Sequence, residues 1–354
     1  MSERFPPGED IAIISTNNLK KVFGNLTAVN DLHLQVLRGD VFGFLGPNGS
    51  GKTTTIRMLL GLIRPTAGEA LLFGMNNQHQ LPAIMRRIGA IVETPVFYPY
   101  LSGLDNLRVI AVNSGMVGGR RNDKRLAEVL EIVELTADAK RAYQKYSLGM
   151  KQRLGIAAAL LTDPELVLLD EPTNGLDPSG VIEIRRLIKR LSSLGKTIFL
   201  SSHILSEVQQ VCNRVGILRK GNLVKQGNVG ELLQDSEQIE VRMIREEQLH
   251  AAHAILQQAR QRGADWITDI TIERNRHDQP VLMLDAPAMR SPEVTMLLAQ
   301  NNLFVAEIHP REGNLEDLYL QVTTPSSPTG PLASMEALAN PGQGKTGSEK
   351  GGAR

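Results

Sequence analysis

The sequence predicts an α/β fold, in which a mixed sheet is flanked by helices, followed by a smaller α+β unit. The first observation is an alternation of β-rich and helical segments from Ile11 to about Gly230, which recurs on a smaller scale from Gln238 to Val322. The second is size, because 354 residues with 42% hydrophobic content are enough for one large core and one smaller core. The third is a glycine-rich loop that follows a short apolar strand and opens a helix.

In the first region, the expected strands are short apolar or β-branched segments, and the expected helices have apolar residues at helical spacing. Strands are predicted at Ala12–Thr16, Leu32–Leu37, Val41–Leu45, Glu69–Leu72, Leu166–Leu169, Thr197–Ser201 and Val215–Arg219. From Leu81 to Ala159 the pattern is mainly helical, so we expect a helical insert at about 81–159. Its clearest helix is Asp123–Leu135, with an apolar stripe of Leu126, Val129, Leu130 and Val133.

The glycine-rich loop has the sequence GPNGSGKT, which is the pattern of a phosphate-binding loop. Its glycines can adopt positive φ and direct several backbone N–H groups toward one point, where the helix N-terminus adds a positive dipole. Lys52 would supply a charge to the β and γ phosphates, and the Thr53 hydroxyl would be a ligand for Mg²⁺. The predicted nucleotide-binding residues are Gly46, Pro47, Asn48, Gly49, Ser50, Gly51, Lys52, Thr53 and Thr54.

A second site element is the segment LVLLDEPTNGLD, in which an apolar strand ends in two adjacent carboxylates. Asp170 would hold Mg²⁺ directly or through water, and Glu171 would orient and deprotonate the water beside the γ phosphate. The loop and this strand together predict a site that hydrolyses a bound nucleotide.

Charge and composition argue against several classes of protein. The net charge is +1, from 39 basic and 38 acidic residues, so nucleic acid is not expected as a main partner. No apolar run reaches the about 18 residues that span a bilayer, and MSERFPPGED lacks the apolar core of a secretion signal, so we expect a cytoplasmic chain. The one cysteine, Cys212, lies in a helical pattern with three valines and is interpreted as a buried structural thiol.

The second region predicts a small ferredoxin-like unit, because its elements follow the order strand, helix, strand, strand, helix, strand. These are Ile239–Ile244, Glu246–Arg262, Ile267–Ile272, Val281–Leu284, Ser291–Asn302 and Leu303–Ile308. From Thr323 onward the chain is rich in Pro, Gly, Ser and Thr, which indicates disorder. We therefore expect a flexible N-terminus at 1–10, a nucleotide-binding domain at 11–235, a small domain at 236–322 and a disordered tail at 323–354.

The segment YSLGMKQR, Tyr146–Arg153, resembles the signature of ABC ATPases, and the sequence from about Leu19 to Gly227 is similar to the ATP-binding subunit of an ABC transporter. The resemblance implies ATP as the nucleotide. It also implies that Ser147 and Gly149 contact the γ phosphate bound by the opposite subunit, so a complete site needs a head-to-tail homodimer. Taken alone, without the flanking motifs, Ser147 and Gly149 would be better interpreted as an ordinary helix N-cap.

The same resemblance gives roles to three more residues. His203, in the segment SSH, matches the switch histidine that contacts the γ phosphate and helps to position Glu171. Asp177 lies in a segment that resembles the loop communicating between the two active sites, although a simple turn is the alternative. Phe23 occupies the position of the aromatic residue that stacks on adenine, where Tyr is more usual, and a core aromatic is the alternative.

The chain departs from the family pattern at three positions. Glu93 stands where the family has a glutamine that touches Mg²⁺ and senses the membrane partner. Its carboxylate can still bind Mg²⁺, but it would add negative charge near Asp170 and Glu171 that its protonation or Mg²⁺ contact must compensate. Leu148 and Met150 replace a glycine and a glutamine of the signature. This combination is similar to bacterial exporter ATPases related to bacitracin and lantibiotic self-protection.

The resemblance implies a motor subunit that hydrolyses ATP, two copies of which dock on separate multi-helix membrane permease subunits at the cytoplasmic face of the cell membrane. The segment Glu93–Leu101 and the helical insert would receive a coupling helix from that partner. The alternative is a soluble ABC ATPase that acts on ribosomes or DNA, or as a regulatory module. One ATP-binding domain, no sustained heptads and a small net charge weigh against it. The small domain would be a regulatory binder or, as we prefer, a brace of the dimer.

Overall fold

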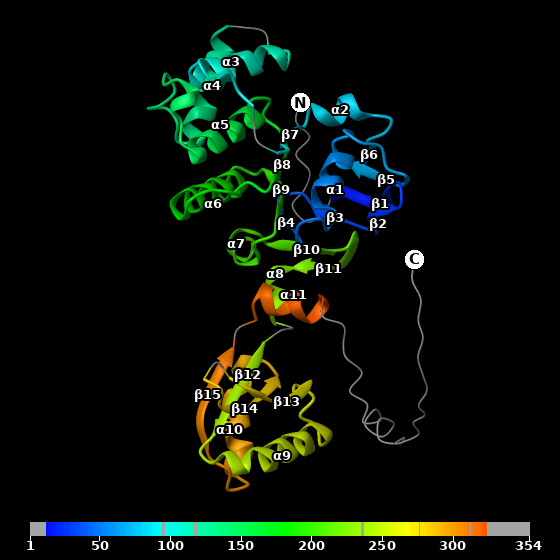
Figure 1. Ribbon diagram of the computed structural model, residues 1–354, viewed down its shortest axis with the longest axis vertical. Coiled ribbons are helices and arrows are strands. Elements are labelled where there is room, and N and C mark those ends of the chain that lie inside the picture. The colour runs from blue at the N-terminus through cyan, green and yellow to red at the C-terminus, as the bar shows by residue number, and fades with distance from the viewer. Residues whose placement is uncertain are drawn as a thin grey trace, which may run out of the picture. The chain divides into compact units, whose positions relative to one another are not determined.

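The computed structural model describes residues 12–93, 96–116, 119–234, 237–275, 277–311 and 313–323 (Figure 1). These residues belong to one compact unit, Met1–Thr323. The predicted flexible N-terminus at 1–10 lies outside the described residues, as does the predicted tail at 323–354 except for Thr323, which ends a helix.

The centre of the fold is a six-stranded mixed sheet in the order β11-β10-β4-β9-β8-β7. Strands β10, β4, β9, β8 and β7 run parallel, and β11 is antiparallel to β10. The parallel strands are short and buried on both faces, as expected when helices or other strands cover each side. Their bounds are β4 (Val41–Leu45), β7 (Ile88–Ile91), β8 (Leu166–Asp170), β9 (Thr197–Ser202), β10 (Arg214–Arg219) and β11 (Asn222–Asn228).

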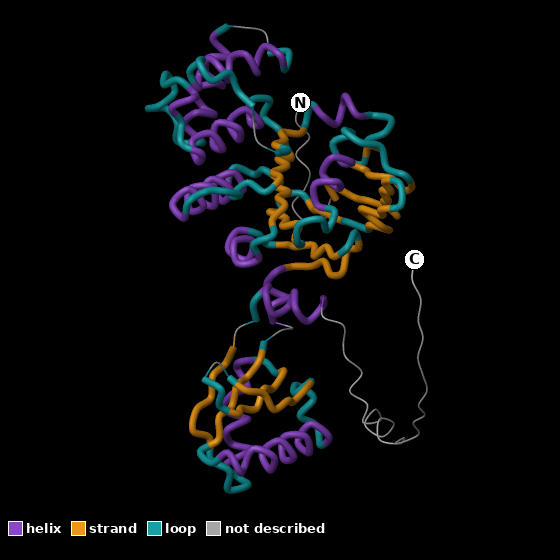
Figure 2. Tube along the Cα trace, in the orientation of Figure 1, coloured by secondary structure: helices purple, strands orange, loops and turns teal. Residues whose placement is uncertain are grey.

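One face of this sheet packs on helix α1 and on a second, antiparallel sheet (Figures 1 and 2). Leu166 and Leu168 of β8 point into this core, with Phe199 of β9 stacked on Phe42 of β4 at a ring-centre distance of 5.7 Å. The elements are α1 (Lys52–Leu59), β1 (Ala12–Phe23), β2 (Leu26–Leu32), β3 (Gln35–Leu37), β5 (Ala67–Leu72) and β6 (Met75–Asn76).

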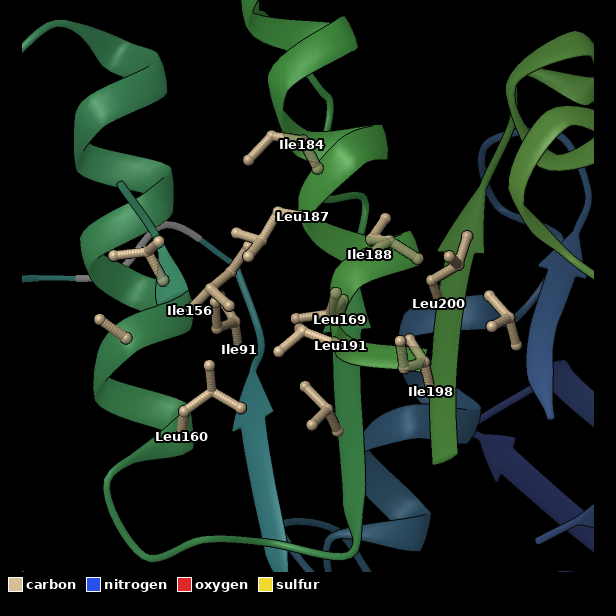
Figure 3. Close-up of a cluster of buried hydrophobic side chains, with 14 of the residues drawn as sticks. Ile91, Ile156, Leu160, Leu169, Ile184, Leu187, Ile188, Leu191, Ile198 and Leu200 are labelled. Atoms are coloured by element: carbon tan, nitrogen blue, oxygen red, sulfur yellow. The ribbon is translucent and has the colours of Figure 1, made fainter. Parts of the chain in front are cut away.

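The other face packs on helices α5 (Leu148–Leu160), α6 (Pro178–Ser193) and α7 (Leu205–Val211). The alternate residues of the same strands enter this core: Val167 and Leu169 from β8, for example. Figure 3 shows Leu169 meeting Leu191 of α6, with Ile156 and Leu160 of α5 beyond them. The two faces of the sheet therefore fill two separate cores.

Helices α3 (Gly103–Asn113), α4 (Arg120–Ile132) and the short η1 (Tyr143–Lys145) precede α5. The predicted stripe of α4, which includes Leu126 and Val129, is buried as expected. The helical insert is nevertheless shorter than the predicted 81–159, because only α2 (Leu81–Met85) is helical before β7, and β7 belongs to the central sheet. The four residues of β7 are too few to show whether their apolar pattern repeats with the period of a strand or of a helix.

The predicted strand at 32–37 is in fact two strands, β2 and β3, which pair with different parts of β1. The Thr16 hydroxyl occupies the gap between them, because it donates to Leu32 O at 2.7 Å and accepts from Leu34 N at 2.8 Å. The Thr16 side chain therefore bridges the break between the two strands, next to the backbone bond from Thr16 N to Leu34 O at 2.9 Å. Cys212 is buried as predicted, but at the end of α7 rather than inside a helix, and burial raises the pKa of its thiol.

Residues 238–311 form an antiparallel sheet in the order β13-β14-β12-β15, with two helices that complete a separate hydrophobic core. The order of elements along the chain is the one predicted. The bounds are β12 (Gln238–Met243), η2 (Glu246–Gln248), α9 (Leu249–Gln261), β13 (Asp269–Arg274), β14 (Pro280–Asp285), η3 (Ala288–Arg290), α10 (Ser291–Ala299) and β15 (Val305–Arg311).

The last described helix, α11 (Leu315–Thr323), packs against α7, α8 (Val229–Gln234) and β11. Leu315 and Leu318 are buried in the same core as α5, α6 and α7. The backbone N–H of Leu315 donates to Gln209 Oε1 at 3.1 Å. After α8 the chain therefore leaves the part built on the six-stranded sheet and forms the small sheet. It then returns with α11, which completes the core that holds α5, α6 and α7.

Candidate functional site

The phosphate loop connects β4 to α1, and its shape depends on glycine at defined positions. Gly49 and Gly51 have φ of 79° and 109°, in the left-handed region that favours glycine. A Cβ on Gly46 would lie 2.5 Å from Leu218 O, and one on Gly51 would lie 2.5 Å from Ala28 O. The Ser50 hydroxyl is buried and lacks a hydrogen-bond partner among the described residues. The loop is thus a tight backbone cradle with a free polar group.

Lys52 begins helix α1 and is buried beneath the loop. Its Nζ donates to Gly46 O at 2.7 Å and to Pro47 O at 3.3 Å, and it lies 3.1 Å from Glu171 Oε1. The half-buried Thr53 and Thr54 follow in the first turn. The lysine charge is therefore balanced by two carbonyls and one carboxylate.

The two predicted carboxylates end strand β8, next to the end of β9. Glu171 has φ of 47°, so the chain turns sharply after Asp170 and directs the Glu171 side chain toward Lys52. The second oxygen of Glu171, Oε2, is 2.8 Å from His203 Nδ1. The structure thus brings together Lys52, Glu171 and His203, which the sequence placed far apart.

Three consecutive residues at the end of β9 each contact a different part of this site. The Ser201 hydroxyl donates to Asp170 Oδ1 at 2.5 Å and accepts from Glu171 N at 2.9 Å. The carbonyl of Ser202 accepts from Gly46 N at 3.3 Å, and His203 pairs with Glu171. The sequence reasoning missed the two serines. Their signal was two small hydroxyl residues at the end of an apolar strand, TIFLSS.

The residues fit a Mg²⁺–nucleotide at this position. The cradle presents backbone N–H groups and a buried lysine to phosphate, and Thr53 and Asp170 supply the hydroxyl and carboxylate oxygens that Mg²⁺ prefers. Asp170 is buried, with Oδ1 held by Ser201, which leaves Oδ2 as the oxygen for a cation.

The predicted signature residues lie at the N-terminus of α5. Ser147 is the N-cap, and its hydroxyl accepts from Met150 N at 3.2 Å. Gly149 has open space around it, since a Cβ there would meet nothing closer than 3.9 Å. Asp177 similarly caps α6 by accepting from Gly180 N at 3.2 Å. Ser147 and Asp177 are both exposed, and their hydrogen bonds lie within their own helix N-termini.

Phe23 ends strand β1 with 47% of its surface exposed, and Lys21 Nζ lies 4.9 Å from its ring centre. The core alternative for this aromatic residue is therefore wrong. Glu93 is 65% exposed and pairs with Arg57 of α1. The compensation expected from protonation or from Mg²⁺ comes at least in part from Arg57, which pairs with this carboxylate.

The class of protein follows from the way the phosphate loop meets the ends of β8 and β9. A loop lysine, a strand-end carboxylate pair and a polar residue for the attacking water are the parts of a P-loop nucleotide-binding protein. The helical region between β7 and β8, with the signature segment at the start of α5, adds the feature of ABC ATPases.

Comparisons with known proteins agree with this class. A family profile described as ABC transporter matches residues 29–174. The bacitracin transport ATP-binding protein BcrA of Enterococcus faecalis is 38% identical over 308 residues, which cover 87% of this chain and 95% of that protein. The lantibiotic transport ATP-binding protein SrtF of Streptococcus pyogenes is 39% identical over 212 residues, or 60% of this chain and 89% of that protein.

Among solved structures, the dimeric post-hydrolysis state of the ATP-binding cassette MJ0796, bound to ADP and Pi, has a TM-score of 0.55 and 27% identity. The matched region covers 61% of this chain and 98% of the MJ0796 chain. This chain belongs to the family of ABC transporter ATP-binding proteins, as the sequence resemblance implied. Across the described residues, every helix is too short or too polar to span a bilayer.

Proposed function

We propose that this chain hydrolyses ATP as the motor subunit of a bacterial exporter. The observation that carries the proposal is the contact of Glu171 with Lys52 on one oxygen and with His203 on the other. The named functions of BcrA and SrtF, bacitracin and lantibiotic transport, favour export over the alternative of a soluble ABC ATPase.

Glu171 is the general base in this proposal. With one contact on each oxygen, its carboxylate is held in place, and Lys52 offsets its negative charge. Phosphate oxygens compete with Glu171 for Lys52, so nucleotide binding frees Oε1 to take a proton from water, while His203 holds Oε2. Bound Mg²⁺, held through Thr53 and Asp170, would neutralise charge on the phosphates. ATP binding and activation of the base are thereby linked through one lysine.

The complete site requires two chains. The Ser147 hydroxyl and the Asp177 carboxylate are exposed at helix N-termini, and Gly149 of the signature is half-buried with open space around it. A phosphate on a second copy could be reached there. We therefore infer a head-to-tail homodimer, an arrangement supported by the dimeric state of the related ATP-binding cassette.

The membrane partner would dock beside the helical region. An open groove of about 600 Å³ lies along β7 and is lined by Ile91, Phe97 and Ile110, among others. Val96, at its edge, is 94% exposed, and two exposed tyrosines, Tyr98 and Tyr100, follow. Such apolar exposure suits a short helix of a multi-helix permease. The chain would then sit on the cytoplasmic face of the membrane as a peripheral subunit, without a nucleic-acid partner.

The small sheet would form a ferredoxin-like domain that braces the dimer. The antiparallel order β13-β14-β12-β15 with two helices supports the fold. We place the nucleotide-binding domain at 11–235, with α11 as its last helix, and the small domain at 236–311. The predicted limit of 322 is moved because Leu315 and Leu318 pack in the larger core.

The hydrolysis proposal is tested with Glu171→Gln. We expect turnover to fall by about 10²-fold or more, with ATP binding retained and an ATP-bound dimer trapped. The matched control is Glu165→Gln, which changes a carboxylate next to the opposite end of β8. Normal turnover by Glu171→Gln would defeat the assignment of the base.

The exporter proposal is tested by purifying the chain from gently solubilised native membranes and identifying stoichiometric companions by mass spectrometry. A multi-helix membrane protein supports transport, whereas a ribosomal or DNA-associated companion overturns it and leaves the ATPase chemistry intact.

The brace is tested by excising 237–311 and joining α8 to α11 through a short linker. Deletion of everything after Gly230 is unsuitable, because it also removes Leu232 and Leu318 from the larger core. We expect weaker self-association with ATP binding unchanged, and undiminished self-association would reject the brace.

A further inference from the structure

We propose that Ser201 is a positioning residue for the hydrolytic base Glu171. The inference rests on the proposed ATP hydrolysis and assigns a role to a residue outside the phosphate loop, the carboxylate pair and the switch histidine. Ser201 is fully buried, and its hydroxyl bonds both to Asp170 and to the backbone of Glu171.

The Ser201 hydroxyl donates one of its two hydrogen bonds and accepts the other. A hydroxyl has one donor and two acceptor sites. The Ser201 O–H donates to Asp170 Oδ1 at 2.5 Å, and the Ser201 oxygen accepts from the Glu171 backbone N–H at 2.9 Å. Because the Ser201 O–H points toward Asp170, the lone pairs of the Ser201 oxygen face the Glu171 N–H. The Asp170 carboxylate therefore fixes the direction of the hydroxyl.

The backbone of Glu171 needs this acceptor. Parallel pairing between β8 and β9 ends at Asp170 and Ser201, and Glu171 turns away with φ of 47°. Its N–H therefore has no further position in the ladder to bond to. A non-glycine residue in this conformation persists only where its surroundings fix it. Ser201 supplies that fixation from the neighbouring strand.

Ser201 affects the orientation of the Glu171 carboxylate through the backbone of Glu171. Lys52 and His203 hold the two oxygens of Glu171, but Lys52 must exchange its carboxylate contact for phosphate when nucleotide binds. From then on, the orientation of Glu171 depends on His203 and on its own backbone. Ser201 is the contact that keeps this backbone in place during the step at which the base works.

The experiment measures steady-state ATP hydrolysis by the full-length protein with Ser201→Ala, using Thr197→Val as the matched control. Thr197 is also buried in β9, and its hydroxyl accepts from Gly39 N at the opposite end of the strand. We expect Ser201→Ala to lower kcat about tenfold, the effect of about 1.4 kcal/mol on the barrier, with KM changed less than about twofold. Thr197→Val keeps its kcat.

A purely structural role would alter KM, ATP binding and kcat together, so binding of a fluorescent ATP analogue is measured in parallel. If Ser201→Ala fails to fold, Ser201→Cys carries the test, because it keeps the shape and a weak donor and acceptor. We expect the kcat of Ser201→Cys to lie between those of the wild type and of Glu171→Gln. Wild-type kcat in either folded variant overturns the inference.

A double-mutant cycle separates this inference from the proposed function. Ser201→Ala should cost about tenfold when Glu171 is present but less than about twofold in the Glu171→Gln background, because the two residues act as one unit. Equal cost in both backgrounds overturns the positioning role while hydrolysis by Glu171 stands. Normal turnover by Glu171→Gln alone overturns the proposed function instead.

Discussion

Replacing Leu318 by alanine tests whether α11 is part of the ATP-binding core. Leu318 is 2% exposed and packs with residues of α7 and α8. Leu→Ala changes at buried sites cost about 2–5 kcal/mol, and we take about 3 kcal/mol because α11 lies at the edge of the core. For a unit of this size, each kcal/mol lowers Tm by about 2–4 °C, so the expected loss is about 6–12 °C.

The assay is thermal unfolding of the full-length protein followed by circular dichroism, with and without ATP. The matched control is Leu320→Ala on the same helix, where the side chain is 59% exposed and the expected cost is below about 1 kcal/mol. ATP binds the folded state, so it should raise the Tm of the wild type and of both variants. Equal melting temperatures for Leu318→Ala and the wild type would refute the packing argument.

Three further predictions concern single positions. Gly51→Ala should weaken ATP binding at least about tenfold in a titration, because φ of 109° and the 2.5 Å approach to Ala28 O exclude a side chain; unchanged affinity contradicts the cradle. Phe23→Ala should raise the Kd for ATP about tenfold and the Kd for inorganic triphosphate little, since stacking on a base is worth about 1–3 kcal/mol. The Arg87 hydrogen bond lowers the pKa of Glu165 from its ordinary 4.5, so this carboxylate stabilises the fold above that value and loses the effect as pH falls through the folded pKa. Glu165→Gln should thus reduce the free energy of unfolding in urea by below about 1 kcal/mol at pH 7, and a deficit that persists undiminished in acid would contradict this.

The sequence predicted the parts of the site that depend on local order. Val41–Leu45 is β4 as expected, and the phosphate loop that follows must be glycine-rich wherever it occurs. Asp170 and Glu171 were placed correctly at a strand end because an apolar run followed by two acids leaves few alternatives. Parallel strands bring their carboxyl ends to one edge, so the proximity of Glu171 and His203 followed from the fold class.

The features of the site and fold that the sequence did not predict depend mainly on contacts between residues distant in sequence. The pairing of Lys52 with Glu171, and that of Glu93 with Arg57, are choices among several possible partners that only the packed side chains decide. Ser201 looked like a strand residue until its two bonds to the carboxylate strand were visible. The four residues of β7 were too few to show a period.

Helix α11 is synthesised after all the other described elements, yet it fills a gap in the core formed by the first 234 residues. Domains fold largely in the order in which they leave the ribosome, so the ATP-binding unit stays incomplete while the small sheet emerges and folds. A chain that stops before Leu315 would leave uncovered the faces of α7 and α8 that α11 packs on, and exposed apolar surface of this kind is recognised by chaperones and proteases. The last helix is therefore needed to complete the ATP-binding unit, and we expect only a chain translated past Leu318 to fold stably.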